Sequence, residues 1–488
     1  MNESSIKTTS LKSVKWVSLG ILLPKLFAPL ITILLTIYLS PKDFGIVAIC
    51  GVFIGFFTII QGLGITEYII KDQEIDDEKL NTAFFTNVFL SIIIYLIFLV
   101  STPLIFYIYK EEILLKIFPI LSFTIILDSI GNVHLSLLRK KMKFRQIFFI
   151  NFYPILISII IILPLAYYGK GVWALVIGSL AKSLVINIHY IISSKWIPKF
   201  QYNKNKLKEM FHFGKWVIIE KAQESIYLNI DILLLGYFGN LSITGIYSLA
   251  RNWIWIVYGI INGPLANIVY PAVSKIQNSI EKLKETICEI LHRIILINLP
   301  VTIGLSIVSY ILFPLIFKEK WNGISEIFAI LVIGEGVSRN MGVQRDLFKI
   351  INRPDIYPKY FFINILFALI TYPIAIKYGI ITFCFIRILN DFIYTYIQII
   401  LTSKLFKIKF KDYYRISFHT ILSTLIMGSF LLIIIFVAKR TNIINDYFLS
   451  AILILAGILV YSFSIRLFEF TVYNKIINEL KIIIGLKK

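Results

Sequence analysis

The chain has 488 residues, of which 58% are hydrophobic and only 16% are charged. Soluble globular proteins carry roughly 25% charged residues, so this composition, with a mean hydropathy of +0.81, excludes a soluble fold. A net charge of +21 would suggest a nucleic-acid partner in a soluble protein, but most Lys and Arg residues lie in alternate loops between apolar segments, so no nucleic acid is expected.

Apolar segments long enough to cross a bilayer follow one another along the chain. About 20 residues cross the hydrocarbon core, and the connections between the segments are short. The predicted spans are residues 14–39, 44–69, 81–102, 113–136, 147–168, 172–192, 213–238, 245–270, 288–310, 324–344, 359–377, 380–402, 415–437 and 447–467. The sequence therefore predicts an all-α membrane protein of about fourteen transmembrane helices.

The basic residues predict how these helices are oriented. If the N-terminus is cytoplasmic, the cytoplasmic segments hold 33 of the 49 Lys and Arg residues, and the opposite segments hold 9. Cytoplasmic loops of membrane proteins carry an excess of Lys and Arg. We therefore expect a multi-pass membrane protein with both termini in the cytoplasm.

The sequence also repeats itself with an offset of six spans. Ile33–Ala48 resembles Ile232–Leu249, the motif FFIN at 148–151 recurs at 361–364, and Tyr168-Gly169 recurs as Tyr378-Gly379. An even number of helices per repeat preserves orientation, so the repeats are expected to be parallel and related by a pseudo-twofold axis along the membrane normal. The predicted parts are an N-lobe at 1–200 with helices 1–6, a C-lobe at 201–402 with helices 7–12, and helices 13–14 with a cytoplasmic tail at 403–488.

Three motifs carry a resemblance to a known family. The segments LSPKDFGIVA (Leu39–Ala48), NIDILLLGYFGNLSITGIYSLA (Asn229–Ala250) and YPAVSKIQ (Tyr270–Gln277) resemble the polysaccharide (O-antigen/exopolysaccharide) flippase branch of the multidrug/oligosaccharidyl-lipid/polysaccharide exporter superfamily. The resemblance implies two six-helix lobes around a central cavity plus two C-terminal helices. It also implies alternating access that carries an isoprenoid (undecaprenyl) diphosphate-linked oligosaccharide from the cytoplasmic to the outer leaflet of a prokaryotic cell (inner) membrane.

Further partners are expected from this function. They are membrane lipid, a coupling ion (H⁺ or Na⁺), and a polysaccharide polymerase and glycosyltransferases that act on the same glycan. No cofactor is expected.

Seven basic residues fall inside the predicted spans, where an ionisable group costs at least ~2.5–3.5 kcal/mol and needs a partner, water or a function. Lys25 lies between Pro24 and Pro29, and prolines bend a helix and free its carbonyl groups. Its ammonium would complement a diphosphate or an acidic sugar, or would pair with Asp128 or Asp231 of another helix. The expected substrate-binding residues are Lys25, Arg251, Arg387, Arg339 and Lys182.

Arg251 follows the Tyr-Ser-Leu-Ala element of the eighth span. A guanidinium gives two parallel hydrogen bonds to a phosphate, so Arg251 is a candidate for holding the head group. The alternative is that its side chain extends to the outer membrane surface.

The acidic residues are candidates for ion coupling or gating. Glu220, Glu224, Tyr227 and Asp231 stand at i, i+4, i+7 and i+11, which places them on one face of the seventh span. That face is expected to line a cavity whose carboxylates take up a coupling cation, although Glu220 and Glu224 near the helix end could simply be solvated. The expected coupling or gating residues are Asp231, Glu224, Glu220, Glu335, Asp391 and Asp128.

Three of these acids have alternative structural explanations. Glu335 with Arg339 and Arg387 with Asp391 have i,i+4 spacing, so each pair could neutralise itself on one helix instead of forming a gate or a diphosphate contact. Asp128 could form a buried polar cluster with Asn132 and His134.

Two other functions remain as alternatives to the flippase. The first is an ion-coupled multidrug or cation antiporter of the same superfamily, in whose cavity acidic residues should dominate. The second is a polytopic polysaccharide polymerase or glycosyltransferase, which would need catalytic residues in a large outer loop, whereas the predicted outer loops are short. No Walker motif is present, so ATP hydrolysis is not expected. The three cysteines and five histidines are dispersed, so no metal site is expected, and no catalytic residues are expected either.

Overall fold

The structure, a computed structural model, describes residues 20, 23–72, 75–274, 280–339, 356–406, 408–441, 445–469 and 474. Within these residues every regular element is helical, and all but one 3₁₀ turn at Glu319–Trp321 are α-helices. The chain forms two compact units, Met1–Leu249 with Ala368–Lys377 (unit 1) and Ala250–Phe367 with Tyr378–Lys488 (unit 2). The boundary between these units at 249/250 does not coincide with the predicted lobe boundary at 200/201. The lobes therefore stay a prediction.

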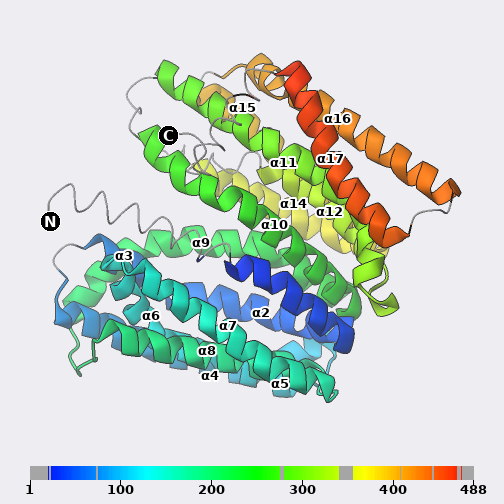
Figure 1. Ribbon diagram of the computed structural model, residues 1–488. Helices are drawn as coiled ribbons and strands as arrows, with labels where there is room; N and C mark the ends of the chain where they lie inside the picture. The colour runs from blue at the N-terminus through cyan, green and yellow to red at the C-terminus, as the bar shows by residue number, and fades with distance from the viewer. Residues whose placement is uncertain are drawn as a thin grey trace. The chain divides into compact units, whose positions relative to one another are not determined.

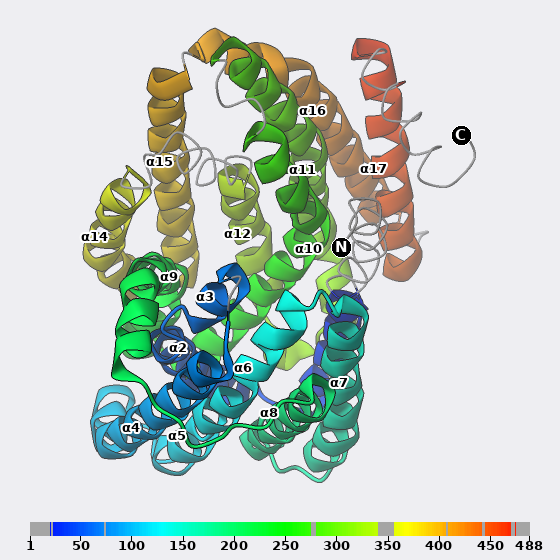
Figure 2. The same ribbon diagram turned by 90° about the vertical axis from the view of Figure 1, so that its left-hand side faces the viewer.

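Unit 1 contains the N-terminal helices and the start of a helix that continues into unit 2 (Figure 1). Its helix α7 packs on α8, α8 packs on α6, α6 packs on α4, and α2 packs on α9 (Figures 1 and 2). The helices are Leu23–Tyr38, α2 (Pro41–Gln61), α3 (Ile65–Lys71), α4 (Asp77–Tyr109), α5 (Leu114–Ser122), α6 (Thr124–Lys140), α7 (Phe144–Tyr167), α8 (Val172–Ser194), α9 (Lys204–Phe238) and the first part of α10 (Leu241–Ser274).

Unit 2 contains the rest of α10 and the C-terminal helices. Here α12 packs on α11 and α15, while α16 packs on α11 and α17. The helices are α11 (Ile280–Ile316), α12 (Ile324–Arg339), α14 (Ile356–Lys377), α15 (Ile380–Phe406), α16 (Phe410–Thr441) and α17 (Asp446–Phe468), with the end of α14 belonging to unit 1.

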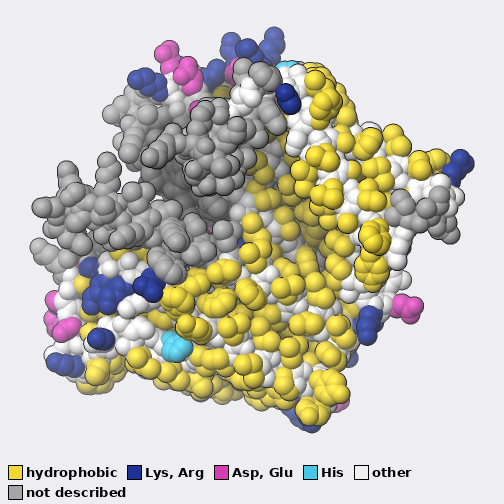
Figure 3. Space-filling model, in the orientation of Figure 1, with side chains coloured by type: hydrophobic (Ala, Val, Ile, Leu, Met, Phe, Trp, Pro, Cys, Tyr) yellow, Lys and Arg dark blue, Asp and Glu magenta, His cyan; other side chains and the backbone are white. Residues whose placement is uncertain are grey.

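The structure confirms the all-α membrane fold. Among the described residues, nine helices are long and apolar enough to cross a membrane, and Leu23–Tyr38 and Phe362–Lys377 are shorter apolar helices. Within the described residues each predicted span coincides with helical structure, the second being formed by α2 and α3 and the fourth by α5 and α6 in succession. The visible surface of each unit is largely hydrophobic, and Lys and Arg side chains gather at its margins (Figure 3), as expected of helices that face lipid.

The first repeated motif explains where α2 begins. Ser40 caps the helix, since its Oγ accepts a hydrogen bond from the backbone N–H of Asp43 while Asp43 Oδ2 accepts one from the Ser40 N–H at 2.8 Å. Pro41, whose fixed φ suits a first helical turn, follows at once. Asn240 occupies the corresponding position before α10, and its Oδ1 accepts a hydrogen bond from the Ile243 N–H at 2.8 Å.

The two repeats meet at these helix starts. A Cβ atom added to Gly45 would collide with the carbonyl oxygen of Leu241, and one added to Gly245 would collide with the carbonyl oxygen of Pro41. Pro41 and Leu241, like Gly45 and Gly245, are 200 positions apart in the sequence. A reciprocal contact of this kind is what a local twofold axis produces, so it supports the predicted parallel repeats.

Candidate functional site

Three buried charged side chains form a cluster in unit 2. Arg387 and Asp391 of α15 are 4% and 3% exposed, and Glu335 of α12 is 7% exposed. Arg387 Nη1 pairs with Asp391 Oδ1, and Arg387 Nη2 lies 3.5 Å from Glu335 Oε1. One guanidinium therefore stands between two carboxylates on adjacent helices, in an apolar environment where an unpaired charge would be costly.

The i,i+4 pair of Arg387 and Asp391 that the sequence predicted is present. The contact between Glu335 and Arg387 was not predicted, because it joins two helices. It depends on Gly334, since a Cβ atom there would lie only 2.8 Å from Asp391 Oδ2. The side chain of Arg339 lies outside the described residues, so its predicted pairing with Glu335 stays a prediction.

A second polar contact holds α12 to its neighbours in unit 2. The fully buried Tyr258 of α10 has its Oη 2.5 Å from Thr302 Oγ1 of α11 and donates to the carbonyl oxygen of Val332 at 3.3 Å. Gly336 leaves room for Tyr258 and Thr302, because a Cβ atom there would collide with both. The glycines that flank Glu335 therefore let α12 approach α10, α11 and α15 closely enough to fix the carboxylate.

Asp231 is anchored inside unit 1. It is 1% exposed, and its Oδ2 accepts a 2.5 Å hydrogen bond from Oη of Tyr247, which is fully buried. Both residues belong to the motif Asn229–Ala250, so the repeated element itself positions the carboxylate. Glu220 and Glu224, on the same helix, are half-buried.

Replacing Tyr247 with phenylalanine is expected to destabilise the protein, because it removes one hydrogen bond to a buried carboxylate, worth about 1–3 kcal/mol. The thermal unfolding midpoint in detergent should fall by several degrees. Tyr237→Phe is the matched control, since Tyr237 on α9 is 54% exposed. Equal midpoints for the two variants would contradict a structural role for the bond to Asp231.

Asp128 and Lys182 lie together in unit 1. Asp128 Oδ1 accepts hydrogen bonds from Ser183 Oγ at 2.5 Å and Asn187 Nδ2 at 2.9 Å, both on α8. Lys182 precedes Ser183 and lies within electrostatic reach of Asp128. Both charged side chains belong to membrane-spanning helices, where Asp128 and Lys182 offset each other's charge.

Asp128, Asn132 and His134 do not form one cluster. Asn132 Oδ1 accepts from Thr66 Oγ1 at 3.1 Å, and His134 Nδ1 lies 2.7 Å from Ser194 Oγ. At about 100° per residue, positions 128 and 134 point roughly 120° apart on the helix, so they contact different neighbours.

Lys25 and Arg251 belong to different units. Lys25 is half-buried in the helix Leu23–Tyr38 of unit 1. Arg251 in unit 2 is 5% exposed, and its guanidinium carbon lies 4.7 Å from the ring centroid of Trp255. Arg251 therefore packs on an aromatic ring one turn along α10 and does not extend to the outer surface as the alternative required.

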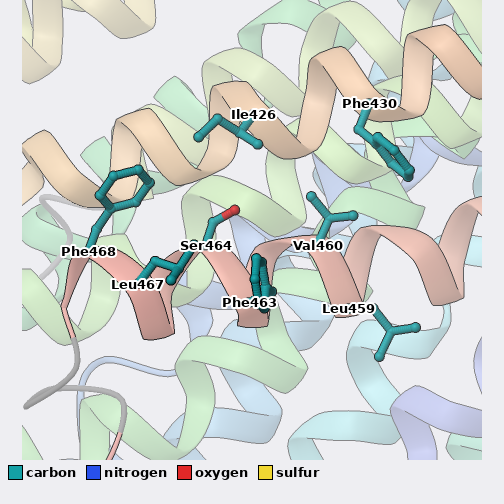
Figure 4. Close-up of a pocket in the computed structure, with 8 residues that line it drawn as sticks. All are labelled: Ile426, Phe430, Leu459, Val460, Phe463, Ser464, Leu467 and Phe468. Carbon is teal, nitrogen blue, oxygen red and sulfur yellow. The ribbon is translucent and has the colours of Figure 1, made fainter.

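Two apolar grooves lie along the last two helices, and neither was predicted from the sequence. One, of about 490 Å³, lies between α11, α16 and α17 and is lined by apolar residues that include Pro300, Gly304, Met427 and Gly457. The other, of about 440 Å³, lies along α16 and α17 (Figure 4). Small residues in otherwise bulky apolar helices, such as Gly304 and Gly457, were the signal that could have indicated the first groove.

No group of three or more His, Cys, Asp or Glu side chains within the described segments could hold a metal ion. Unit 2 thus contains the ion pairs of Arg387 and two apolar grooves, and unit 1 contains the buried carboxylate of Asp231 bonded to Tyr247. Ionisable side chains within membrane-spanning helices mark substrate or ion pathways, as expected of a polytopic transporter. The chain belongs to the polysaccharide biosynthesis protein family, whose model matches residues 34–326, and to the polysaccharide-flippase branch that its motifs predicted.

Curated relatives agree with this assignment. The chain is 24% identical over 341 residues to the lipopolysaccharide biosynthesis protein WzxC of Escherichia coli (strain K12), an alignment that covers 69% of each chain. It is 25% identical over 282 residues to the teichuronic acid biosynthesis protein TuaB of Bacillus subtilis (strain 168), covering 57% of this chain and 58% of TuaB.

The structure is similar to that of the lipid II flippase MurJ in an inward closed conformation, with a TM-score of 0.72 and 18% identity over 96% of this chain and 99% of that one. It is also similar to a variant of the MATE transporter VcmN of Vibrio cholerae, with a TM-score of 0.56 and 12% identity over 84% and 99% of the two chains. These likenesses establish the fold. Membership of the polysaccharide-flippase branch confirms the prediction of a transporter.

Proposed function

We propose that the protein is a flippase that moves an isoprenoid-diphosphate-linked oligosaccharide from the cytoplasmic to the outer leaflet by alternating access, for surface polysaccharide biosynthesis. Family membership and the fold shared with a lipid II flippase support this proposal. In it, the lobes at 1–200 and 201–402 enclose the cavity, the segment 403–488 adds helices 13 and 14, and both termini are cytoplasmic.

The observation that carries the proposal is the apolar groove between α11, α16 and α17. Its volume of about 490 Å³ and its almost wholly apolar lining suit a flexible hydrocarbon chain. A substrate with a long lipid tail needs such a surface at the side of the transporter, because the tail stays in lipid while the head group crosses. A small soluble drug would have no use for it.

Four cationic side chains within the helices provide the complementary chemistry for the head group. Arg387 and Arg251 carry guanidinium groups that can hold a phosphate through two parallel hydrogen bonds. Lys25 and Lys182 add ammonium groups on helices of unit 1. In the proposed cycle these side chains contact the diphosphate, and Asp231 or the acids around Arg387 respond to the coupling ion.

An ion-coupled antiporter is the second candidate. The observation that favours it is the number of buried carboxylates, since Asp231, Glu335 and Asp391 are each less than a tenth exposed. Deleting the gene separates the two candidates. If the protein is a flippase, the deletion strain should trap lipid-linked glycan on the cytoplasmic side and lose its surface glycan. Loss of drug resistance with normal surface glycan would reject the flippase.

Lys25→Ala and Arg251→Ala are each expected to abolish export while the protein still inserts, because each removes a cation proposed to hold the diphosphate. Export is measured as surface glycan in a deletion strain that carries the variant, and insertion as protein in washed membranes. Lys170→Ala and Arg440→Ala are the matched controls. Lys170 is exposed, and Arg440 stacks on Phe436 at 4.9 Å much as Arg251 stacks on Trp255.

Wild-type export by both Lys25→Ala and Arg251→Ala would remove these residues from the proposed substrate site. Loss of export in the controls as well would show that the assay responds to any lost surface cation.

A further inference from the structure

A groove of about 1000 Å³ in unit 1 is lined by α4, α9 and the segment between α8 and α9. The ribbon shows this segment passing α4 (Figure 2). Its floor includes Leu63, Phe85 and Leu90, and its rim carries large aromatic side chains. Phe200, Phe89, Tyr202 and Phe211 are 89%, 64%, 56% and 50% exposed. Exposed aromatic side chains gathered around one groove mark a surface that is covered in the working protein.

The segment that carries two of these aromatics is held firmly. Asn81 of α4, 1% exposed, accepts a hydrogen bond from the Lys199 N–H at 2.8 Å and donates one to the side chain of Gln201 at 3.0 Å. The buried hydroxyl of Thr82 accepts one from the Asn203 N–H at 3.1 Å. Lys199, Gln201 and Asn203 are thus bonded to α4. Phe200 and Tyr202, which alternate with them, are held outward, so the groove exists before any ligand binds.

Two lysines complete the rim. Lys204 and Lys208 line the groove from the first turns of α9, and neither ammonium has an ion-pair partner in the part of the chain that the structure describes. Lys206 between them points about 160° away and pairs with Asp76 at 2.6 Å and Glu78 at 2.5 Å. Its hydrogen bonds to Asp76, and then to Glu78, raise the pKa of Lys206.

The position of these cations is unfavourable for the helix itself. The N-terminus of a helix carries a partial positive charge, so Lys204 in the first turn of α9 is destabilising unless an anion offsets it. Lys208 adds a like charge at i,i+4 from Lys204, which is also unfavourable. Asp76 and Glu78 offset Lys206, which leaves Lys204 and Lys208 as an uncompensated pair beside an apolar groove. An anionic head group with hydrocarbon chains matches both halves of this surface.

We propose that this groove binds an anionic phospholipid of the cytoplasmic leaflet, with its acyl chains against Phe85, Phe89 and Phe211 and its phosphate between Lys204 and Lys208. The segment 193–216 lies on the side that the charge count assigns to the cytoplasm. Anionic lipids of that leaflet are attracted by clustered basic residues near the membrane surface. The site is separate from the groove along α11, α16 and α17, and it does not depend on which substrate is transported.

The test measures lipid binding to the purified full-length protein in neutral detergent by native mass spectrometry. Two cations near the phosphate predict that the first dioleoyl phosphatidylglycerol binds about 30-fold more tightly than dioleoyl phosphatidylcholine. Lys204→Gln/Lys208→Gln should remove this preference. The control Lys141→Gln/Lys143→Gln removes the same charge from residues that do not line the groove and should keep it.

A second variant tests the apolar half without touching the charges. Phe89→Gln should weaken binding of both lipids while the preference for phosphatidylglycerol remains. An equal preference in all variants, or its loss in the control pair, would reject the site.

Two competitors test the assigned occupant. Displacement of phosphatidylglycerol by millimolar inorganic phosphate would indicate a simple anion site and overturn the assignment to a lipid. Displacement by equimolar undecaprenyl diphosphate would make the groove an entry site for the transported lipid instead. Failure of both competitors supports the proposal.

Discussion

Replacing Gly45 with alanine is expected to destabilise the protein strongly and to stop export. The added Cβ would collide with the carbonyl oxygen of Leu241 and lie 3.2 Å from the backbone nitrogen of Gly245. Both obstacles are backbone atoms at the start of α10, so no side-chain rotation relieves the contact. Overpacking of this kind costs typically 1–3 kcal/mol, and more where backbone must move. Gly245→Ala should have the same effect, because its Cβ meets Pro41 in the reciprocal way.

Matched controls lie on the same helix. A Cβ atom at Gly51 or Gly55 of α2 has no neighbour within 4 Å. Alanine at these positions should leave the thermal unfolding midpoint unchanged or raise it, since alanine is favoured over glycine inside a helix by about 0.8–1.0 kcal/mol. Midpoints that fall alike for Gly45→Ala and Gly55→Ala would mean that the contact between the repeats has no special importance.

The transmembrane helices could be predicted from the sequence, but the contact between Gly45 and Gly245 could not. The spans were predictable because crossing a bilayer requires about 20 predominantly apolar residues, and such stretches are visible in the sequence. The motif LSPKDFG indicated a polar turn before a new helix, and Ser40, Pro41 and Asp43 form the cap there. The sequence also showed the repeat, but not that Gly45 and Gly245 are the residues through which its two copies touch.

The partners of the buried charges were predictable only along a single helix. Helical periodicity places Arg387 beside Asp391, but it does not fix how α12 is rotated against α15, so the contact with Glu335 was missed. The bond between Tyr247 and Asp231 was missed for the same reason, since it joins α10 to α9. Grooves are harder still, because they depend on how the side chains of three helices fill the space between them.

Replacing Arg387 with methionine is expected to prevent accumulation of the folded protein. The change leaves Asp391 and Glu335 in a buried region without the guanidinium that stands between them. Removing one partner of a buried ion pair costs about 3–5 kcal/mol, a large part of the stability of a typical protein. The measurement is the amount of monodisperse protein recovered from membranes, together with its unfolding midpoint.

A variant that removes all three charges separates stability from transport. Replacing a whole buried ion cluster by apolar residues is often neutral or stabilising, so Arg387→Met/Asp391→Leu/Glu335→Leu should accumulate like the wild type. If the cluster binds the diphosphate or works as a gate, this variant will be folded and yet unable to export glycan, because the charges that respond to substrate are gone. Normal export by the folded triple variant would instead assign the cluster a purely structural role, and Arg387, Asp391 and Glu335 would leave the proposed transport site together.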